Sequence, residues 1–129
     1  MSYQEAYGNY HAVNLDSQTS RATPVELVLL LTDGLLDELA RVRAHIIGKR
    51  YEQKAAGIDK CCEIINGLSS SLDFDSGGDT VVNLANLYDF CSSRLQGAGI
   101  KMDPAMVDEV VGVLTTIRQG WQGVQARNA

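Results

Sequence analysis

The stretch from Thr23 to Arg50 reads TPVELVLLLTDGLLDELARVRAHIIGKR, and it decides the fold class. Apolar residues recur in it at steps of three or four, which places them on one face of an amphipathic helix. The stripe consists of Val28, Leu31, Leu35, Leu39, Val42 and Ile46. A pattern of this length and regularity predicts a long helix with one buried face.

The two ends of this helix are also marked in the sequence. Thr23 and Glu26 have the spacing of a capping box, in which each side chain accepts a hydrogen bond from the other residue's backbone N–H. Pro24 suits the first helical position because its missing N–H has no partner there anyway. Gly48, followed by two basic residues, is typical of a helix end. We therefore predict a helix over 24–47.

Three further stretches carry the same spacing. The second runs over 51–72 and stops before Ser76-Gly77-Gly78, and the fourth starts at Asp103-Pro104 and runs over 104–126. The third covers 79–98. No stretch alternates with the period of two that a strand requires.

The third helix has specific expected ends. Asp79 is a good N-cap residue, so we expect it to start this helix. Gly97 and Gly99 disfavour helix, so we expect them to end it.

Four helices of similar length joined by short connections predict an all-α fold, an antiparallel up-down-up-down four-helix bundle over 24–129. Residues 1–23 lack a sustained apolar stripe and are expected to form an N-terminal arm, with or without a short helix.

Composition restricts the function classes. The 129 residues are 45% hydrophobic, enough for one core, and the formal net charge is −5 without any basic run. Nucleic acid and anionic membranes are therefore not expected partners. The N-terminus lacks the pattern of a signal peptide, and the longest apolar run, Leu27–Leu31, has five residues. We expect a cytoplasmic protein without membrane insertion.

Catalytic and metal-binding patterns are not evident. The two histidines, His11 and His45, do not belong to a Glu-x-x-His pair. The residues 73–79, DFDSGGD, place acids at the first and third positions of a calcium loop, but Leu84 occupies the twelfth position, where a glutamate is needed. We interpret this segment as a turn. No metal, cofactor or enzymatic activity is expected.

The cysteines lack the spacing of a disulfide framework or a zinc site. Cys61 and Cys62 are neighbours on one helix and point about 100° apart, and Cys91 lies on the next helix. We expect reduced thiols in a cytosolic core.

The second and third helices have more apolar residues than one bundle face needs. Ile64, Leu68, Leu87 and Phe90 widen their stripes. These residues either lie at helix boundaries or under the arm, or they form a groove for an amphipathic helix or an extended apolar segment.

Glycines inside the second and fourth helices also have two interpretations. Close helix–helix approach is one, and local looseness that lets the bundle adjust to a bound chain is the other. The residues concerned are Gly57, Gly67, Gly112, Gly120 and Gly123.

The sequence resembles the flagellar secretion chaperones called FliS over nearly its whole length. The matching motifs are Tyr10-x-x-Val13, Ala22-Thr23-Pro24-Val25-Glu26-Leu27, Leu31-Thr32-Asp33-Gly34, Ile64-Ile65-Asn66-Gly67-Leu68, Ser71-Leu72-Asp73, Gly77-Gly78, Asn83-Leu84-x-x-Leu87-Tyr88-Asp89-Phe90, Arg94-Leu95 and Trp121. Two departures are Thr32, where the family usually has an aromatic residue, and Phe90, where it usually has tyrosine.

The resemblance implies a non-enzymatic export chaperone that binds the C-terminal segment of flagellin, keeps it from polymerising and helps to present it to the export gate protein FlhA. We expect the partner-binding groove to comprise Ile64, Leu68, Leu72, Leu84, Leu87, Tyr88 and Phe90, with Tyr88 at the edge of the core. Tyr7, Tyr10 and Val13 are expected to lie on an arm that covers this groove in the free protein.

Two other functions remain open from the residues alone. A helical adaptor for a different secretion or regulatory protein would use the same groove. A small cofactor-binding bundle enzyme is the second alternative. The apolar excess is also compatible with self-association.

Overall fold

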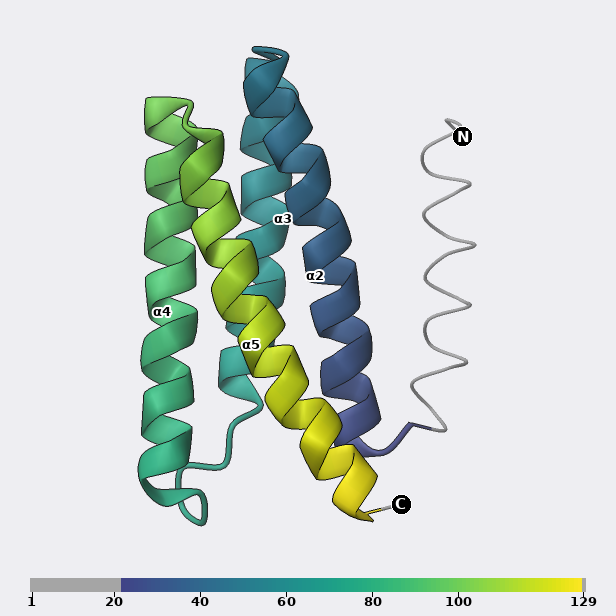
Figure 1. The fold of residues 1–129 in the computed structure, drawn as a ribbon. Coiled ribbons are helices and arrows are strands. Elements are labelled where there is room, and N and C mark those ends of the chain that lie inside the picture. The colour runs from purple at the N-terminus through teal and green to yellow at the C-terminus, as the bar shows by residue number, and fades with distance from the viewer. Residues whose placement is uncertain (1–21, 129) are drawn as a thin grey trace, which may run out of the picture.

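A computed structural model describes residues 22–128, which form four α-helices. They are α2 (Pro24–Ile47), α3 (Tyr51–Ser70), α4 (Gly78–Lys101) and α5 (Pro104–Asn128). Both α2 and α4 pack against α3 and α5, and successive helices run in opposite directions (Figure 1). This arrangement confirms the predicted all-α four-helix bundle. The predicted arm, 1–23, lies almost wholly outside the described residues.

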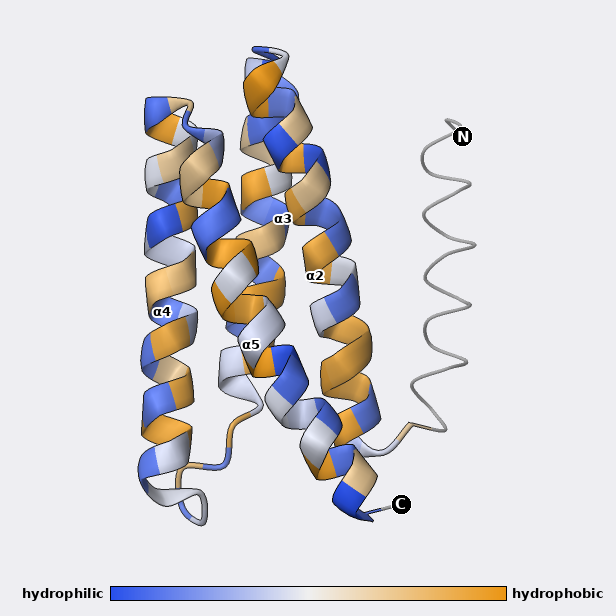
Figure 2. Cartoon of the chain, in the orientation of Figure 1, coloured by the Kyte–Doolittle hydropathy of each residue, from blue (hydrophilic) through white to orange (hydrophobic). Residues whose placement is uncertain are grey.

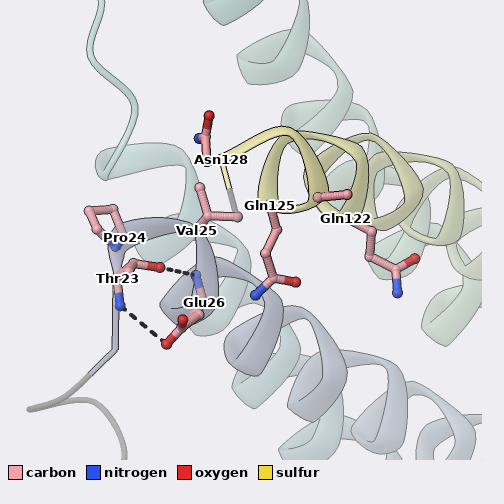
Figure 3. Close-up of a pocket in the computed structure, with 8 residues that line it drawn as sticks. Thr23, Pro24, Val25, Glu26, Gln122, Gln125 and Asn128 are labelled. Carbon is pink, nitrogen blue, oxygen red and sulfur yellow. Dashed lines mark hydrogen bonds between the residues drawn. The ribbon is translucent and has the colours of Figure 1, made fainter.

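The start of α2 follows the predicted capping box. The Glu26 backbone N–H donates to Thr23 Oγ1 at 3.1 Å, and the Thr23 backbone N–H donates to Glu26 Oε2 at 3.3 Å (Figure 3). The helix ends at Gly48 as predicted, although Gly48 itself has φ −81°. The left-handed conformation falls on the next residue, Lys49, with φ 54°.

The predicted ends of the third helix were wrong. Gly77 precedes α4 without a side-chain cap, and Asp79 lies inside the first turn, where its charge still favours the positive end of the helix dipole. At the other end α4 continues through Gly97 and Gly99 to Lys101, and Met102 ends it in the left-handed conformation with φ 51°.

Packing explains why these glycines do not end α4. A Cβ atom on Gly99 would lie 2.5 Å from Ile58 Cδ1, and one on Gly97 would lie 2.9 Å from Met106 Cε. Both glycines therefore let the neighbouring helices approach closely, and the packing outweighs their low helix propensity of about 1 kcal/mol each.

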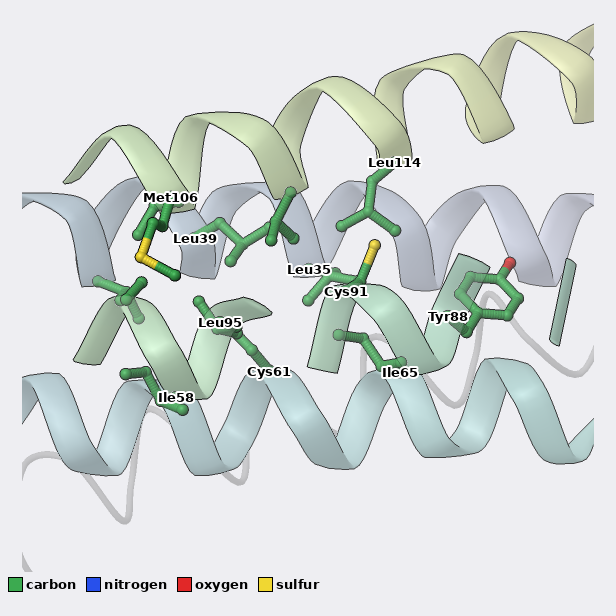
Figure 4. Close-up of a cluster of buried hydrophobic side chains, with 14 of the residues drawn as sticks. Leu35, Leu39, Ile58, Cys61, Ile65, Tyr88, Cys91, Leu95, Met106 and Leu114 are labelled. Carbon is green, nitrogen blue, oxygen red and sulfur yellow. The ribbon is translucent and has the colours of Figure 1, made fainter. Parts of the chain in front are cut away.

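A continuous apolar core runs along the inside of the bundle (Figure 4). Orange, hydrophobic positions alternate with blue, hydrophilic ones around each helix, as an amphipathic pattern requires (Figure 2). The side chains at the centre of the core are fully buried: Leu35, Leu39, Val42, Cys61, Cys91, Leu95, Val107, Val110 and Leu114. Thr32, the first departure from the family pattern, is also buried, and its hydroxyl donates to the Val28 carbonyl at 2.7 Å.

The helical glycines differ from one another. A Cβ atom on Gly57 would lie 2.7 Å from Val42 Cγ2, so close approach of α3 to α2 explains this position. At Gly67, Gly112 and Gly120 a Cβ atom would meet nothing within 4 Å. Close approach within the bundle was therefore the wrong interpretation for these three.

Candidate partner-binding groove

An apolar groove of about 420 Å³ opens at the end of the bundle where the loop 71–77 joins α3 to α4. At this end α4 and α5 diverge, whereas they lie close together at the opposite end (Figure 1). All four helices contribute to the walls, together with the loop. The lining residues are Pro24, Val25, Leu27, Val28, Leu31, Leu68, Ser71, Leu72, Asp73, Ser76, Gly77, Thr80, Val81, Leu84, Tyr88 and Trp121.

The groove is a continuation of the core. Leu68 and Tyr88 are each 1% exposed and belong both to the core and to the groove lining. Leu72 and Leu84 pack against the core and are half-buried, so part of their surface faces the opening. An apolar side chain placed here would gain about 25 cal/mol for each Å² of apolar surface removed from water.

Asp73 is the one charged residue among those that line the groove. Its carboxylate accepts hydrogen bonds from the Ser76 hydroxyl and from the Asp75 backbone N–H. These two bonds lower the pKa of Asp73, the Ser76 bond most. Asp73 is therefore ionised at neutral pH, and its oxygens fix the turn, as the sequence interpretation of 73–79 predicted.

The expected groove residues fall into two sets. Leu68, Leu72, Leu84 and Tyr88 come together in the groove. Tyr88 is fully buried, which is deeper than the core edge predicted for it.

The other expected residues lie elsewhere. Ile64 is half-buried against the core, away from the groove lining. Leu87 and Phe90 are 39% and 42% exposed on the outside of α4, and the Arg94 guanidinium lies 5.8 Å from the centre of the Phe90 ring. They form an apolar surface separate from the groove. The expected covering residues Tyr7, Tyr10 and Val13 lie outside the described part of the chain.

Sequence reasoning missed the α2 side of the groove and Trp121. Leu27, Val28 and Leu31 were assigned to a helix stripe or to no role, yet they form one wall. The signal was the unbroken run Leu27–Leu31, which is wider than one buried face needs.

A second, larger hollow of about 760 Å³ lies between the first turn of α2 and the last turns of α5 (Figure 3). Its walls are Thr23, Pro24, Val25, Glu26, Gln122, Gln125, Ala126 and Asn128. Five of these eight residues are polar, whereas aliphatic and aromatic residues make up most of the lining of the smaller groove. The smaller groove is therefore the better candidate site for an apolar segment.

The cysteines do not form a reactive site. Cys61 and Cys91 are buried in the core as free thiols. Burial raises the pKa of the Cys61 thiol to about 12 and that of the Cys91 thiol to about 11. Since the thiolate is the nucleophile, both are poorly reactive near neutral pH.

Residues 22–128 have neither a cluster of metal ligands nor a helix that could span a membrane. This part of the chain brings no three His, Cys, Asp or Glu side chains together in an arrangement that could hold a metal ion. None of its helices combines the length and the apolar character needed to cross a membrane.

The fold and the groove define an antiparallel helical bundle with an apolar groove at one end. The family model described as flagellar protein FliS matches residues 6–128. The chain belongs to the FliS family, as the sequence motifs indicated.

Known relatives agree with this assignment. The chain is similar to the flagellar secretion chaperone FliSB of Pseudomonas aeruginosa, with 34% identity over 96% of this chain and 98% of the relative. It is 32% identical to the flagellar secretion chaperone FliS of Salmonella typhimurium, over 92% and 88% of the two chains. A solved bacterial flagellar chaperone has the same fold, with a TM-score of 0.76, 17% identity and coverage of 98% and 99%.

Proposed function

We propose that this protein is an export chaperone that binds the C-terminal segment of flagellin in the apolar groove and keeps it from polymerising before export. The main observation in support is an apolar groove that is continuous with the core. It occurs in a chain whose relatives are named flagellar secretion chaperones. No catalytic step and no cofactor are part of this proposal.

The geometry suits an apolar segment that becomes ordered on binding. The half-buried Leu72 and Leu84 supply apolar contact area, while the buried Leu68 and Tyr88 form a rigid base. The affinity is the gain from buried apolar surface minus the cost of ordering the segment. Covering the client's apolar face in this way removes the surface through which it would self-associate.

Two finer features belong to the same proposal. The loaded chaperone presents its client to the export gate protein FlhA in the cytoplasm. In the free protein, the arm covers the groove with Tyr7, Tyr10 and Val13. The client displaces the arm when it binds. A Tyr7→Ala, Tyr10→Ala double variant should therefore bind the client more tightly, and titration calorimetry measures the change.

The main test is titration calorimetry with full-length flagellin and with flagellin lacking its C-terminal segment. We expect 1:1 binding that truncation abolishes. Leu72→Asp should weaken binding at least tenfold because it places a charge in the apolar groove. Val82→Asp is the matched control, since Val82 is 49% exposed and does not line the groove.

Other outcomes would contradict the proposal in distinct ways. Binding that survives truncation would exclude the C-terminal segment as the ligand. Equal binding by the Leu72→Asp and Val82→Asp variants would exclude this groove. An Ile64→Asp, Leu87→Asp variant tests the sequence prediction rather than the groove. Normal binding by this variant would exclude both residues from the interface and would agree with their position away from the groove.

A further inference from the structure

Two polar groups lie together in the groove lining, the Tyr88 hydroxyl and the Trp121 indole N–H. The Tyr88 hydroxyl is not one of the buried polar atoms that lack a partner, and Tyr88 lines the groove. The Trp121 Nε1 is buried and has no hydrogen-bond partner of ordinary geometry among residues 22–128. Leaving such a group unsatisfied is costly, so a buried orphan donor requires an explanation.

These two groups are neighbours in the groove lining. Burial raises the pKa of Tyr88, and the adjacent Trp121 indole partly offsets this rise. Tyr88 lies at the end of the row of labelled core side chains (Figure 4), and Trp121 belongs to α5. A phenol oxygen can accept one hydrogen bond while its O–H donates another.

The other nearby hydroxyls in the groove are already used. Ser71 donates to the Leu68 carbonyl at 2.7 Å, and Ser76 donates to Asp73. Thr80 is exposed and has access to water. The Tyr88 O–H is therefore the donor that remains available to a bound molecule.

The charge of the groove limits which kind of hydrogen-bond acceptor can bind to the Tyr88 O–H. Asp73 is ionised at the rim and no basic side chain lines the groove. A carboxylate would meet repulsion here, in a chain of net charge −5. A neutral carbonyl oxygen meets no such penalty.

We propose that Tyr88 and Trp121 form a polar anchor in which the Tyr88 hydroxyl donates to a neutral carbonyl oxygen of the client and the Trp121 indole N–H donates to the Tyr88 oxygen. This inference rests on the proposed function and adds a specificity determinant to it. The groove then selects an apolar segment that carries a free amide carbonyl, either in the main chain or on an Asn or Gln side chain. Main-chain carbonyls are free at the C-terminal end of a helix or in an extended stretch.

The test uses a tryptophan-free synthetic peptide of the flagellin C-terminal segment and the Tyr88→Phe variant, which removes only the hydroxyl. We expect about a three- to tenfold loss of affinity, the size of one neutral hydrogen bond. Tyr51→Phe is the matched control because Tyr51 is 58% exposed on α3 and does not line the groove. Its affinity should equal that of the wild type.

A second measurement does not depend on affinity. The chain has one tryptophan, so its indole proton gives one unambiguous NMR signal. Peptide binding should move this signal downfield in the wild type, as a new hydrogen bond forms, and the Tyr88→Phe variant should lose the shift. Replacing Asn and Gln in the peptide with Ala then identifies the source: a retained Tyr88→Phe effect assigns a main-chain carbonyl, and a lost effect assigns a side-chain amide.

Different results would contradict the polar anchor and the proposed function. Wild-type affinity and an unchanged indole shift in Tyr88→Phe, together with lost binding in Leu72→Asp, would overturn the anchor and leave the groove as the client site. Unchanged binding in both variants would overturn both.

Discussion

The two halves of the bundle are built differently. The closed half contains the connections at Gly48–Arg50 and Met102–Asp103, and its helices approach so closely that Gly57 and Gly99 leave no room for a side chain. Lys54 adds a hydrogen bond across α3 and α4 to the Gly99 carbonyl at 2.9 Å. The open half contains the loop 71–77, and there the helices separate to form the groove.

The difference shows how one small core serves two purposes. Core side chains in the closed half, such as Val42 and Leu95, are fully buried and contribute mainly to stability. Leu72 and Leu84 in the open half leave apolar surface exposed, at the place where the proposed client would bind. Mutations in the two halves should therefore separate stability from binding.

The largest expected effect is a loss of stability from Leu95→Ala, because Leu95 is 0% exposed in the core. We expect a decrease in unfolding free energy of about 2–5 kcal/mol. Leu84→Ala, on the groove wall, should cost about 1 kcal/mol or less but weaken client binding. Urea unfolding followed by circular dichroism measures the first effect and calorimetry the second. Similar losses of stability in the two variants would remove the distinction between the halves.

A smaller effect comes from two glycines of the same helix. Gly57→Ala should lower the unfolding free energy by about 1–3 kcal/mol because the new methyl group meets Val42, whose branched side chain has little rotamer freedom. Gly67→Ala is the matched control because the new methyl group would meet no other atom within 4 Å. This substitution should raise the unfolding free energy by about 0.5–1 kcal/mol. Thermal unfolding of the two variants measures both changes in unfolding free energy. The same sign in both would mean that packing against α2 does not govern Gly57.

The smallest effect concerns the turn that closes the open half. Because the folded pKa of Asp73 lies below its usual value near 3.8, its contribution to stability is present above that value and is lost as the pH falls through the lowered pKa. Ser76→Ala should raise the pKa of Asp73 toward its usual value, measured by an NMR titration of its carboxyl carbon. Ser71→Ala is the control, since that hydroxyl donates to Leu68 instead. Equal shifts in both variants would contradict the role of Ser76.

Much of the fold could be predicted because local signals and packing agree along most of the chain. The capping box at Thr23 and Glu26 and the proline at position 104 mark helix starts through local chemistry alone. The end of the third helix could not be predicted, since Gly97 and Gly99 lie against Met106 and Ile58 on other helices. Such contacts are not visible in a local pattern.

The groove was only partly predictable for a related reason. An apolar stripe indicates which residues leave water, but it does not separate residues under another helix from residues under a future partner. Leu72 and Leu84 line the groove, whereas Leu87 and Phe90 are exposed on the outside of α4. Trp121 lines the groove from α5, far from the other lining residues in the sequence.

The hollow between Thr23 and Asn128 brings the two ends of the described chain to the same end of the bundle as the groove. A client segment joined after Asn128 by a short flexible linker would therefore experience an effective concentration in the millimolar range. A fusion of this kind would convert a bimolecular encounter into an intramolecular one. It would give a single polypeptide in which chaperone and cargo stay paired at any dilution, suited to crystallising a complex that is too weak to isolate.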